Sequence, residues 1–305
     1  MAIPVALCRV GKYEAESVRK SVGMLLETIR CRPPRGARIL VKPNLLTPKK
    51  ALATTHPLVV KAVCEYLLDY GASVSVGDSP AFGTAKKVAN ANGLAEVLNG
   101  LPIEIINLSR PTKIRLASGI SIGISQKALE KDLIINVAKL KAHSQLRVSA
   151  AVKNFFGCVV GFRKALAHCQ YGDISNLFES LLIELMQAMP ETVSLVDGVV
   201  AMQRTGPIDG DPFDLSLLGA SSNPVALDTA LYTILGLQPH HVPLWLESQK
   251  RGLSGAHIHE LSYPLAQPEE FDAAGFTLPS ILKPVTFHPV RFLRGRLKSV
   301  FNRFY

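Results

Sequence analysis

The sequence has few cysteines, and they form no pattern. Five are scattered over 305 residues, with no Cys-x-x-Cys pair among them. Zinc sites and iron–sulfur clusters usually need clustered ligands, and secreted disulfide scaffolds need more cysteines in a shorter chain. Scattered cysteines indicate a reducing compartment, in which most of them serve as small core residues. We therefore expect a cytoplasmic protein.

Long apolar runs and familiar catalytic signatures are also missing. No run approaches the roughly 18–20 apolar residues that a membrane-spanning helix needs. The amino terminus, MAIPVALCRV, has no basic lead, and its apolar part is too short for a secretion signal. The chain contains no Gly-x-Gly-x-x-Gly, Walker A, Gly-x-Ser-x-Gly or His-Glu-x-x-His pattern. No cofactor is therefore indicated by a motif.

Acidic residues are absent from two segments, and this absence locates the charge of the protein. The formal net charge is +10. Residues 133–172 and 283–305 each contain six Lys or Arg and no Asp or Glu, so the remainder of the chain carries a net charge of −2. A nucleic-acid-binding protein more often spreads positive charge along a face. The localised charge argues against a nucleic-acid partner and for a concentrated anion-binding site.

The remaining pattern is that of a well-packed α/β protein. Hydrophobic residues make up 48% of the chain and charged residues 19%. Short apolar runs alternate with helical segments, which is typical of a mainly parallel sheet with helices on both faces. Strands are predicted at residues 3–10, 37–41, 72–77, 103–107, 133–138, 192–200 and 215–221, and helices at residues 14–30, 57–70, 84–92, 148–160, 176–189 and 224–235. A strand or hairpin excursion is expected near residues 113–122.

The carboxyl-terminal part departs from this alternation. A Pro-rich, irregular extension follows Gly252 and is expected to wrap the domain. We predict one α/β domain over residues 1–285 and a basic amphipathic tail over residues 286–305. Read as a helix, the tail has an apolar face made of Leu293, Leu297, Val300 and Phe304. Such a helix often lies on an anionic membrane surface, here through residues 290–305, although docking on the protein itself or on a partner is an equal alternative.

Polar and charged residues gather where the predicted strands end. In open α/β sheets, ligands bind beyond the carboxyl ends of the strands. Turn formation alone explains Asp-Ser-Pro and Asn-Pro sequences, but lysine is not a turn-forming residue. These ends carry Lys42, Asn44, Asp78, Ser79, Lys139, Lys141, His143, Asp197, Ser221, Ser222 and Asn223. The catalytic candidates are Lys139, Lys141, His143, Asp78 and Asp197, and the substrate-binding candidates are Lys42, Asn44, Ser79, Lys153 and Asn154.

The pair Lys139 and Lys141 is harder to explain by turn formation than the other strand-end residues. If the strand continues through them, both side chains project to the same side. Two ammonium groups on one side repel each other unless an anion lies between them, which favours phosphate or carboxylate binding. Crowded lysines also have lowered pKa values and act as bases or nucleophiles. A solvated strand exit is the alternative, and His143 is either an acid/base group, an anion donor or a histidine without a role.

A second cationic group follows in the small-residue segment AAVKNFFGCVVG. Lys153 either extends along a helix edge toward water or points into a pocket. We favour the pocket, because Asn154 is adjacent and Gly157 and Gly161 permit a close backbone approach. Arg163 and Lys164 either close over an anion or are helix-end cations that the helix dipole favours, and here we favour the second interpretation.

Two weaker patterns suggest metal ligands, and we predict no metal site from either. The first consists of Cys158, His168 and Cys169, whose spacing matches no closed zinc or iron–sulfur pattern. The second consists of Asp197, Asp209 and Asp211. These aspartates would hold magnesium opposite the lysines if the substrate were phosphorylated, but a turn-rich loop explains them equally well.

Several segments together resemble the DUF362 family of uncharacterised proteins. In order they are KPNLLT, ATTHPLVVKAVCEYLLDYGASVSVGDSP, INVAKLKAH, KNFFGCVVGFRKALAH, DGVVAMQRTGPIDGDP and NPVALDTAL, from about Lys42 to Gly236. Many members of that family carry a ferredoxin-like iron–sulfur domain, so the resemblance implies redox chemistry. This chain lacks the clustered cysteines, and an iron–sulfur centre would have to come from an external electron-carrier protein. The strand–loop pattern is also similar, more remotely, to the LarA-type racemases.

Two hypotheses about function follow. The leading one is an intracellular enzyme that acts on a small anionic substrate, a carboxylate or a phosphate, with an electron carrier if the reaction is a redox reaction. The alternative is a non-catalytic binding or scaffold protein that docks on an anionic membrane surface or an acidic partner through its tail.

Overall fold

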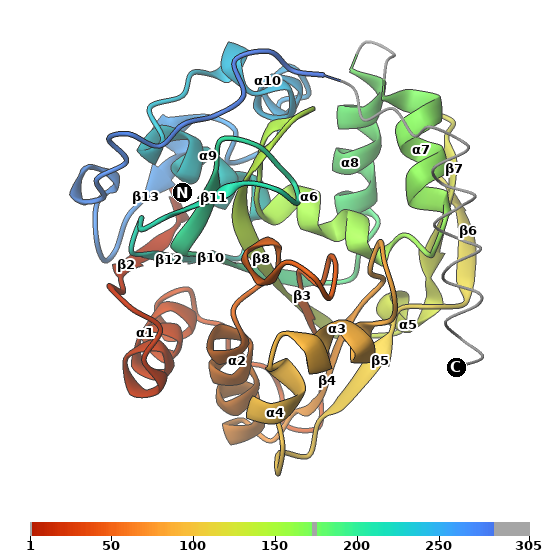
Figure 1. The fold of residues 1–305 in the computed structure, drawn as a ribbon, viewed down its shortest axis with the longest axis vertical. Coiled ribbons are helices and arrows are strands. Elements are labelled where there is room, and N and C mark those ends of the chain that lie inside the picture. Colours follow the sequence, from red (N-terminus) through yellow and green to blue (C-terminus); the bar gives the residue numbers. More distant parts are fainter. Residues whose placement is uncertain (1, 173–175, 284–305) are drawn as a thin grey trace.

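The structure, a computed structural model, describes residues 2–172 and 176–283 (Figure 1). Its centre is a nine-stranded sheet with the order β2-β12-β10-β8-β3-β4-β5, in which β11 also pairs with β10 and β9 with β8. The strands are β2 (Ala6–Arg9), β12 (Leu217–Ser221), β10 (Thr192–Gln203), β8 (Leu133–His143), β3 (Arg38–Pro43), β4 (Ser73–Asp78), β5 (Glu104–Asn107), β11 (Asp211–Phe213) and β9 (Arg147–Ser149).

The predicted mainly parallel sheet is confirmed. Five neighbouring strands, β10, β8, β3, β4 and β5, run parallel. Strand β12 is antiparallel to β10, and β2 is antiparallel to β12, so β2 runs in the same direction as β10. The carboxyl ends of β2, β10, β8, β3 and β4 therefore lie at one edge of the sheet. Ser221, Ser222 and Asn223 were expected there, but this was wrong, because β12 is reversed and Ser221 pairs with Ser194 near the start of β10.

Helices cover both faces of the sheet, as the alternation predicted (Figure 1). Period-two side chains divide the apolar core into two parts, so that Ile39 and Val41 of β3 pack on one face and Leu40 on the other. Helix α2 begins at Pro57, as predicted, and His56 is its cap. One face carries α1 (Ala15–Thr28), α2 (Pro57–Asp69), α3 (Ala85–Ala91) and α4 (Leu94–Val97), and the other carries α6 (Ala151–Asn154), α8 (Leu177–Gln187), α9 (Pro224–Ile234) and α10 (Pro243–Lys250).

Short elements complete the described chain. The excursion expected near residues 113–122 is an antiparallel hairpin of β6 (Pro111–Arg115) and β7 (Ser121–Ser125). The others are β1 (Ile3–Pro4), β13 (Leu261–Ser262), α5 (Gln126–Leu129), α7 (Arg163–Tyr171) and the 3-10 turns η1 (Ala51–Ala53), η2 (Phe155–Cys158), η3 (Pro239–His241), η4 (Ile258–Glu260) and η5 (Pro268–Glu270).

Two predicted elements differ from the observed ones. Strand β8 does not end before Lys139 but continues through His143, because its ladder with β10 and then β9 extends to these residues. The helix predicted over residues 148–160 was also wrong. That segment consists of β9, the short helix α6 and the turn η2, each too short to show helical periodicity in the sequence.

The irregular extension lies along the domain, as expected. Its backbone bonds to the sheet region in several places: Val5 N–H donates to the Ser262 carbonyl at 2.8 Å, and Ala266 N–H to the Leu7 carbonyl at 3.1 Å. The tail over residues 286–305 lies outside the described residues, so the domain boundary and the tail's amphipathic character stay predictions.

The cysteines lie where the sequence analysis expected them. Cys8, Cys31, Cys64 and Cys158 are buried, unpaired thiols, which confirms their role as small core residues. The side chain of Cys169 lies outside what the structure describes.

Among the helices of residues 2–172 and 176–283, none combines the length and the apolar character needed to cross a membrane.

Candidate functional site

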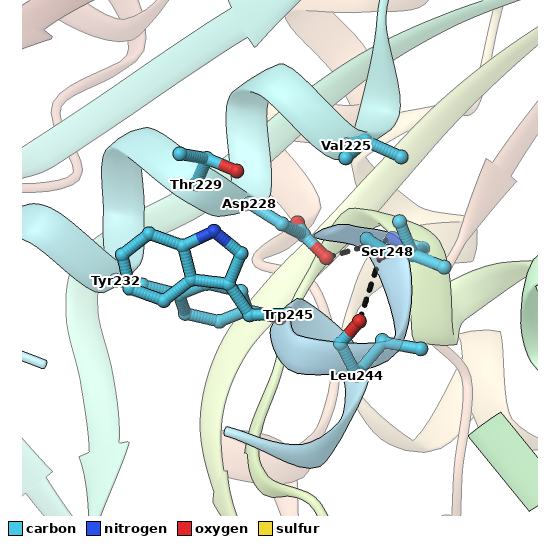
Figure 2. A pocket seen from close by; sticks show the side chains of 8 residues that line it. Val225, Asp228, Thr229, Tyr232, Leu244, Trp245 and Ser248 are labelled. Atoms are coloured by element: carbon cyan, nitrogen blue, oxygen red, sulfur yellow. Dashed lines mark hydrogen bonds between the residues drawn. The ribbon is translucent and has the colours of Figure 1, made fainter. Parts of the chain in front are cut away.

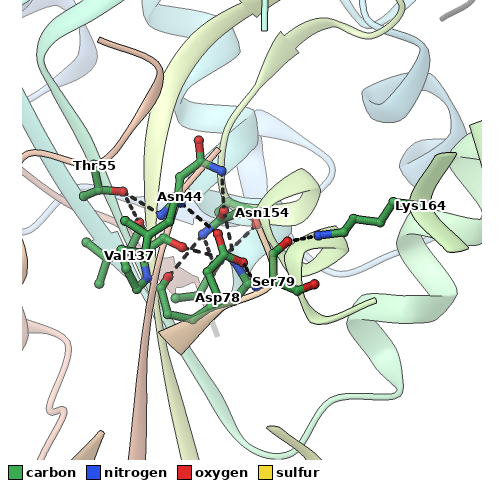
Figure 3. Close-up of polar contacts among 12 residues, drawn as sticks. Asn44, Thr55, Asp78, Ser79, Val137, Asn154 and Lys164 are labelled. Atoms are coloured by element: carbon green, nitrogen blue, oxygen red, sulfur yellow. Dashed lines mark hydrogen bonds and ion pairs between the residues drawn. The ribbon is translucent and has the colours of Figure 1, made fainter. Parts of the chain in front are cut away.

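Most of the predicted strand-end residues meet at the common carboxyl edge of β3, β4, β8 and β10. Figure 3 shows the part of this edge around Asn44, Asp78 and Ser79. Four lysines there are less than a tenth exposed, and Lys164 is partly buried. We call Lys42, Lys139, Lys141, Lys153 and Lys164 the lysine cluster. Its neighbouring buried carboxylates are Asp78 and Asp197.

Lys42 and Asp78 form an ion pair in the interior. The Lys42 Nζ lies 3.0 Å from Asp78 Oδ1, and the two side chains are 0% and 4% exposed. The other carboxylate oxygen of Asp78 accepts the Leu45 N–H at 2.8 Å, and Lys42 also donates to the Pro43 carbonyl at 3.2 Å. Removing two ions from water is favourable only with such additional hydrogen bonds. The pair therefore fixes the end of β3 against the end of β4.

Asn154 connects this pair to the neighbouring strand β8. Its Oδ1 accepts from Lys42 Nζ at 3.3 Å and from Asn44 Nδ2 at 3.0 Å. Its Nδ2 donates to the Lys42 carbonyl at 3.2 Å and to Asn136 Oδ1 at 2.8 Å. Both donor hydrogens and both acceptor positions are thus used (Figure 3). Asn44 and Asn154, both predicted to bind substrate, also organise the site itself.

Lys139 of β8 pairs with Asp197 of β10, which lies opposite it in the ladder. Their Nζ and Oδ2 atoms lie 3.0 Å apart, and both side chains are almost fully buried. Tyr13 completes this group, because its hydroxyl donates to Asp197 Oδ1 at 2.6 Å and accepts from Lys139 at 2.8 Å and from the Val200 N–H at 3.2 Å. The His56 N–H donates to Asp197 at 2.9 Å, and its ring stacks on Tyr13 with a centroid distance of 3.6 Å. Burial and the nearby carboxylate of Asp197 raise the pKa of Tyr13, which therefore keeps its proton.

Lys141 projects to the same side of β8 as Lys139, as the period-two rule predicted. It donates to Asn44 Oδ1 and, at 3.0 Å, to the Ala53 carbonyl. Burial lowers the pKa of Lys141 to about 7, and the positive charges of Lys139 and Lys42 act in the same direction. The amine of Lys141 therefore titrates near neutral pH.

Lys153 lies in an aromatic environment at the end of α6. Its Nζ is 3.8 Å from the centroid of the Phe156 ring and 5.3 Å from that of Phe178. Burial lowers the pKa of Lys153 well below its usual range, and the charges of Lys164, Lys141 and Lys42 lower it further.

His143 is buried beside Lys153, and its ring orientation identifies its tautomer. The Nδ1 atom accepts the Gln145 N–H at 3.1 Å and the Leu146 N–H at 3.2 Å. Burial and the charges of Lys153 and Lys141 keep the pKa of His143 well below its usual range. The neutral ring therefore carries its proton on Nε2, which makes it a hydrogen-bond donor there.

Lys164 and Ser79 connect α7 to the end of β4. Lys164 donates to the Ser79 carbonyl, and the Gly161 N–H donates to the Ser79 hydroxyl at 3.3 Å. Burial lowers the pKa of Lys164 to about 8. The explanation that Arg163 and Lys164 are cations at a helix carboxyl end was wrong, because α7 begins at Arg163 and the dipole opposes a cation there.

The turn η2 brings backbone directly against the Lys42–Asp78 pair. A Cβ atom added at Gly157 would lie 2.7 Å from Lys42 Cε, and closer still to Lys42 Nζ and Asp78 Oδ1. The close backbone approach predicted at this glycine is therefore present. The same prediction for Gly161 was wrong, because a Cβ atom added there would meet no atom within 4 Å.

Asp228 of α9 positions α6 from outside the cluster. The residue before α6 is Ala150, whose side chain cannot cap the helix. Asp228 provides the cap instead, because its carboxylate accepts the Ala151 N–H at 2.7 Å and the Val152 N–H at 3.1 Å. Burial raises the pKa of Asp228 to about 7.

A small cavity of about 10 Å³ lies beside Asp228 between α9 and α10 (Figure 2). Thr229 Oγ1 lines it and has no hydrogen-bond partner among the described residues. Its lining is mostly apolar, and its volume is at the lower limit for a single water molecule. It is too small for a substrate.

The aspartates that could have formed a magnesium site are not arranged around one ion. Asp209 pairs with Lys50 at 3.0 Å and Asp211 with Arg204 at 3.2 Å, both on the exposed surface, whereas Asp197 is buried. Within residues 2–172 and 176–283, no three His, Cys, Asp or Glu side chains are grouped so that they could hold a metal ion.

Sequence reasoning missed Tyr13 and the role of His56. Each follows a strand whose carboxyl end lies at this edge of the sheet: Tyr13 follows β2, which runs in the same direction as β10, and His56 follows β3. Tyr13 could not be assigned to the site without knowing the direction of β12. The functional roles expected for the ten candidate residues stay predictions, although the structure brings these residues to one sheet edge.

Fold and site together define an α/β protein with a buried lysine cluster at the strand ends. The chain matches the domain of unknown function DUF362 over residues 39–233, and it belongs to this family. The thylakoid-associated protein sll1697 of Synechocystis sp. is 36% identical over 312 residues, which cover 100% of this chain and 96% of that protein.

Two solved structures are more distantly similar. The lactate racemase apoprotein of Thermoanaerobacterium thermosaccharolyticum is 15% identical with a TM-score of 0.45, over 73% of this chain and 55% of that one. A structural-genomics protein of Thermotoga maritima is 13% identical with a TM-score of 0.40, over 64% and 52% of the two chains. This chain thus spans about half the length of each of these two structures.

Proposed function

We propose that the protein binds a small anion, a carboxylate or a phosphate ester, at the lysine cluster and acts on it as an enzyme. The observation that supports this proposal is the imbalance of buried charge. Five lysines are accompanied by two carboxylates, Asp78 and Asp197, and both carboxylates are already paired with Lys42 and Lys139. Lys141, Lys153 and Lys164 have no carboxylate partner among the described residues.

A ligand anion would remove this imbalance. Desolvation of an unpaired ammonium costs several kcal/mol, which is why the pKa values of Lys141 and Lys153 are lowered. A bound carboxylate or phosphate restores the attraction that water no longer provides and favours the charged lysines. In this proposal Lys42, Asn44, Ser79, Lys153 and Asn154 hold the anion, and Lys139, Lys141, His143, Asp78 and Asp197 supply acid/base groups.

The test is a thermal-shift titration with carboxylates and phosphate esters. A ligand at 100 times its dissociation constant stabilises the folded state by about 2.7 kcal/mol. We expect this shift in the wild type and in Lys113→Met, which removes an exposed charge on β6, but not in Lys141→Met. Binding should tighten as the pH falls from about 8.5 to 6, because Lys141 and Lys164 gain protons over that range. The proposal fails if no ligand of the panel shifts the wild type, or if Lys141→Met responds like Lys113→Met.

We also propose a peripheral membrane association through residues 290–305. Two observations support it: the relative that is 36% identical is named a thylakoid-associated protein, and this segment is basic with an apolar helical face in the sequence. Co-sedimentation with anionic and with neutral vesicles tests it, using the whole chain and a chain that ends at Pro289. Equal binding of both chains to anionic vesicles would contradict this role of the tail. A redox reaction with an external electron-carrier protein stays a prediction from the family resemblance.

A further inference from the structure

Lys153 differs from the other lysines of the cluster in its contacts. Each of the others donates a hydrogen bond or forms an ion pair, whereas Lys153 Nζ has neither among the described residues and lies over the Phe156 ring. Lys153 is 9% exposed. Its amine is therefore not committed to holding the fold together.

The surroundings of Lys153 oppose a positive charge. Phe156 and Phe178 provide an apolar wall, and a third aromatic ring, His168, packs against both with centroid distances of 5.3 and 4.5 Å. An ammonium over an aromatic face gains roughly 0.5–2 kcal/mol. This gain acts against burial and against the repulsion from three neighbouring lysines, which together lower the pKa of Lys153. The repulsion and burial prevail, so the pKa of Lys153 lies well below its usual range, which favours the neutral, nucleophilic amine.

We propose that Lys153 forms an imine with the carbonyl carbon of a small substrate that also carries a carboxylate or a phosphate, such as a 2-oxo acid. This inference rests on the proposed anion site and names the chemical class of its ligand. In this reaction Lys153 would not hold the anion but bond to the carbonyl carbon, and the neighbouring cations Lys141, Lys42 and Lys164 would hold the anionic group. The aromatic wall would exclude the water that hydrolyses imines.

The reaction is balanced without a further reagent. The Lys153 amine electron pair forms a bond to the carbonyl carbon, and the carbonyl oxygen leaves as water with the two hydrogens of the amine. Nothing is oxidised or reduced. The protonated imine withdraws electrons from the carbon next to the imine carbon, so the enzyme would then remove a proton from that carbon, and hydrolysis of the imine by water would release the product and restore the amine.

Reductive trapping tests this proposal directly on the wild-type protein. The protein is incubated near neutral pH with pyruvate, glyoxylate or glyceraldehyde 3-phosphate, and cyanoborohydride reduces any imine to a stable amine. Mass spectrometry should then show the mass of the ligand less one water and plus two hydrogens. Peptide mapping should place the adduct on Lys153. Each unit by which a lysine pKa is lowered raises its neutral fraction about tenfold, so labelling at Lys153 should exceed that at exposed Lys113 at least tenfold.

Competition and substitution complete the test. Lactate, which has the carboxylate but no carbonyl group, should reduce the labelling of Lys153, and Lys153→Arg should abolish it. If Lys153→Arg does not fold, the mapping on the wild type still decides. The proposal is overturned if Lys153 is unlabelled or is labelled no more than Lys113. If anions stabilise the wild type but Lys153 stays unlabelled, the imine is refuted and the anion site stands. If neither effect occurs, both proposals fail.

Discussion

Substituting Gly157 by alanine tests whether the close backbone approach is needed to form the Lys42–Asp78 pair. The added methyl carbon would lie 2.7 Å from Lys42 Cε and closer still to the two charged atoms. Carbon atoms are at their best separation at about 3.5–4.0 Å, so either η2 or both charged side chains must move. Lys42 is also held by Asn154 and the Pro43 carbonyl, and it cannot move without losing these bonds.

The expected loss of stability can be assembled from two effects. Overpacking a well-packed interior costs about 1–3 kcal/mol. Disturbing a buried ion pair adds to this, up to about 3–5 kcal/mol when the pair is fully broken. Alanine also restricts the unfolded chain more than glycine does, which offsets about 0.5–1 kcal/mol of the lost stability. We therefore expect Gly157→Ala to lower the free energy of unfolding by about 2–4 kcal/mol, measured by urea denaturation with an unchanged slope.

Two variants control this experiment. A Cβ at Gly11 meets no atom within 4 Å, so Gly11→Ala should be as stable as the wild type or slightly more stable. In a Lys42→Ala background two of the three closest atoms are gone, and Gly157→Ala should then cost at least about 1 kcal/mol less than in the wild type. If Gly157→Ala matches Gly11→Ala, the close approach does not constrain the site and the reasoning is refuted.

Three further substitutions probe the hydrogen bonds and the buried charges. Tyr13→Phe removes the hydroxyl that bonds to both Asp197 and Lys139, and it should lower the free energy of unfolding by about 2 kcal/mol. Tyr263→Phe should lower it little, because the Tyr263 hydroxyl has no hydrogen-bond partner among the described residues. Because the pKa of Asp228 is raised in the folded state, its stabilising contribution is fully present below about pH 4 and is lost as the pH rises through about 7. Asp228→Asn should remove this decline in the free energy of unfolding between pH 4 and 7, measured by urea denaturation. An unchanged dependence of stability on pH would argue against it. The lowered pKa of Lys141 works in the opposite direction, so wild-type stability should rise from pH 7.5 to 10 by about 1.4 kcal/mol per unit relative to Lys141→Met, and parallel pH curves would contradict this.

The location of the site could be predicted from the sequence because its signals are local. Lys42 and Asp78 each follow an apolar run that only a strand explains, and parallel strands end at a common edge. The same reasoning correctly placed Lys139 and Lys141 on one side of β8. These inferences need only period-two alternation and the direction of neighbouring strands.

The partners within the site could not be predicted, because they depend on strand order and register. Lys139 meets Asp197 since these two residues lie opposite each other in the β8–β10 ladder, which no local pattern specifies. The reversal of β12 likewise moved Ser221 to the far edge and brought Tyr13 to the near one. The sequence pattern suggested an anion between Lys139 and Lys141, whereas Lys139 is already neutralised by an internal carboxylate.

The wide sequence separation within the site has a consequence for folding kinetics. Asn154 bonds to a lysine 112 positions away, and Tyr13 to an aspartate 184 positions away. Contacts that close such long loops form after much of the chain is ordered, because the loop entropy must be lost first. We expect φ-values near zero for these residues, so that substitutions there accelerate unfolding and leave refolding almost unchanged. A ligand bound at this edge would then act mainly on the lifetime of the native state, and would slow its unfolding without helping the chain to fold.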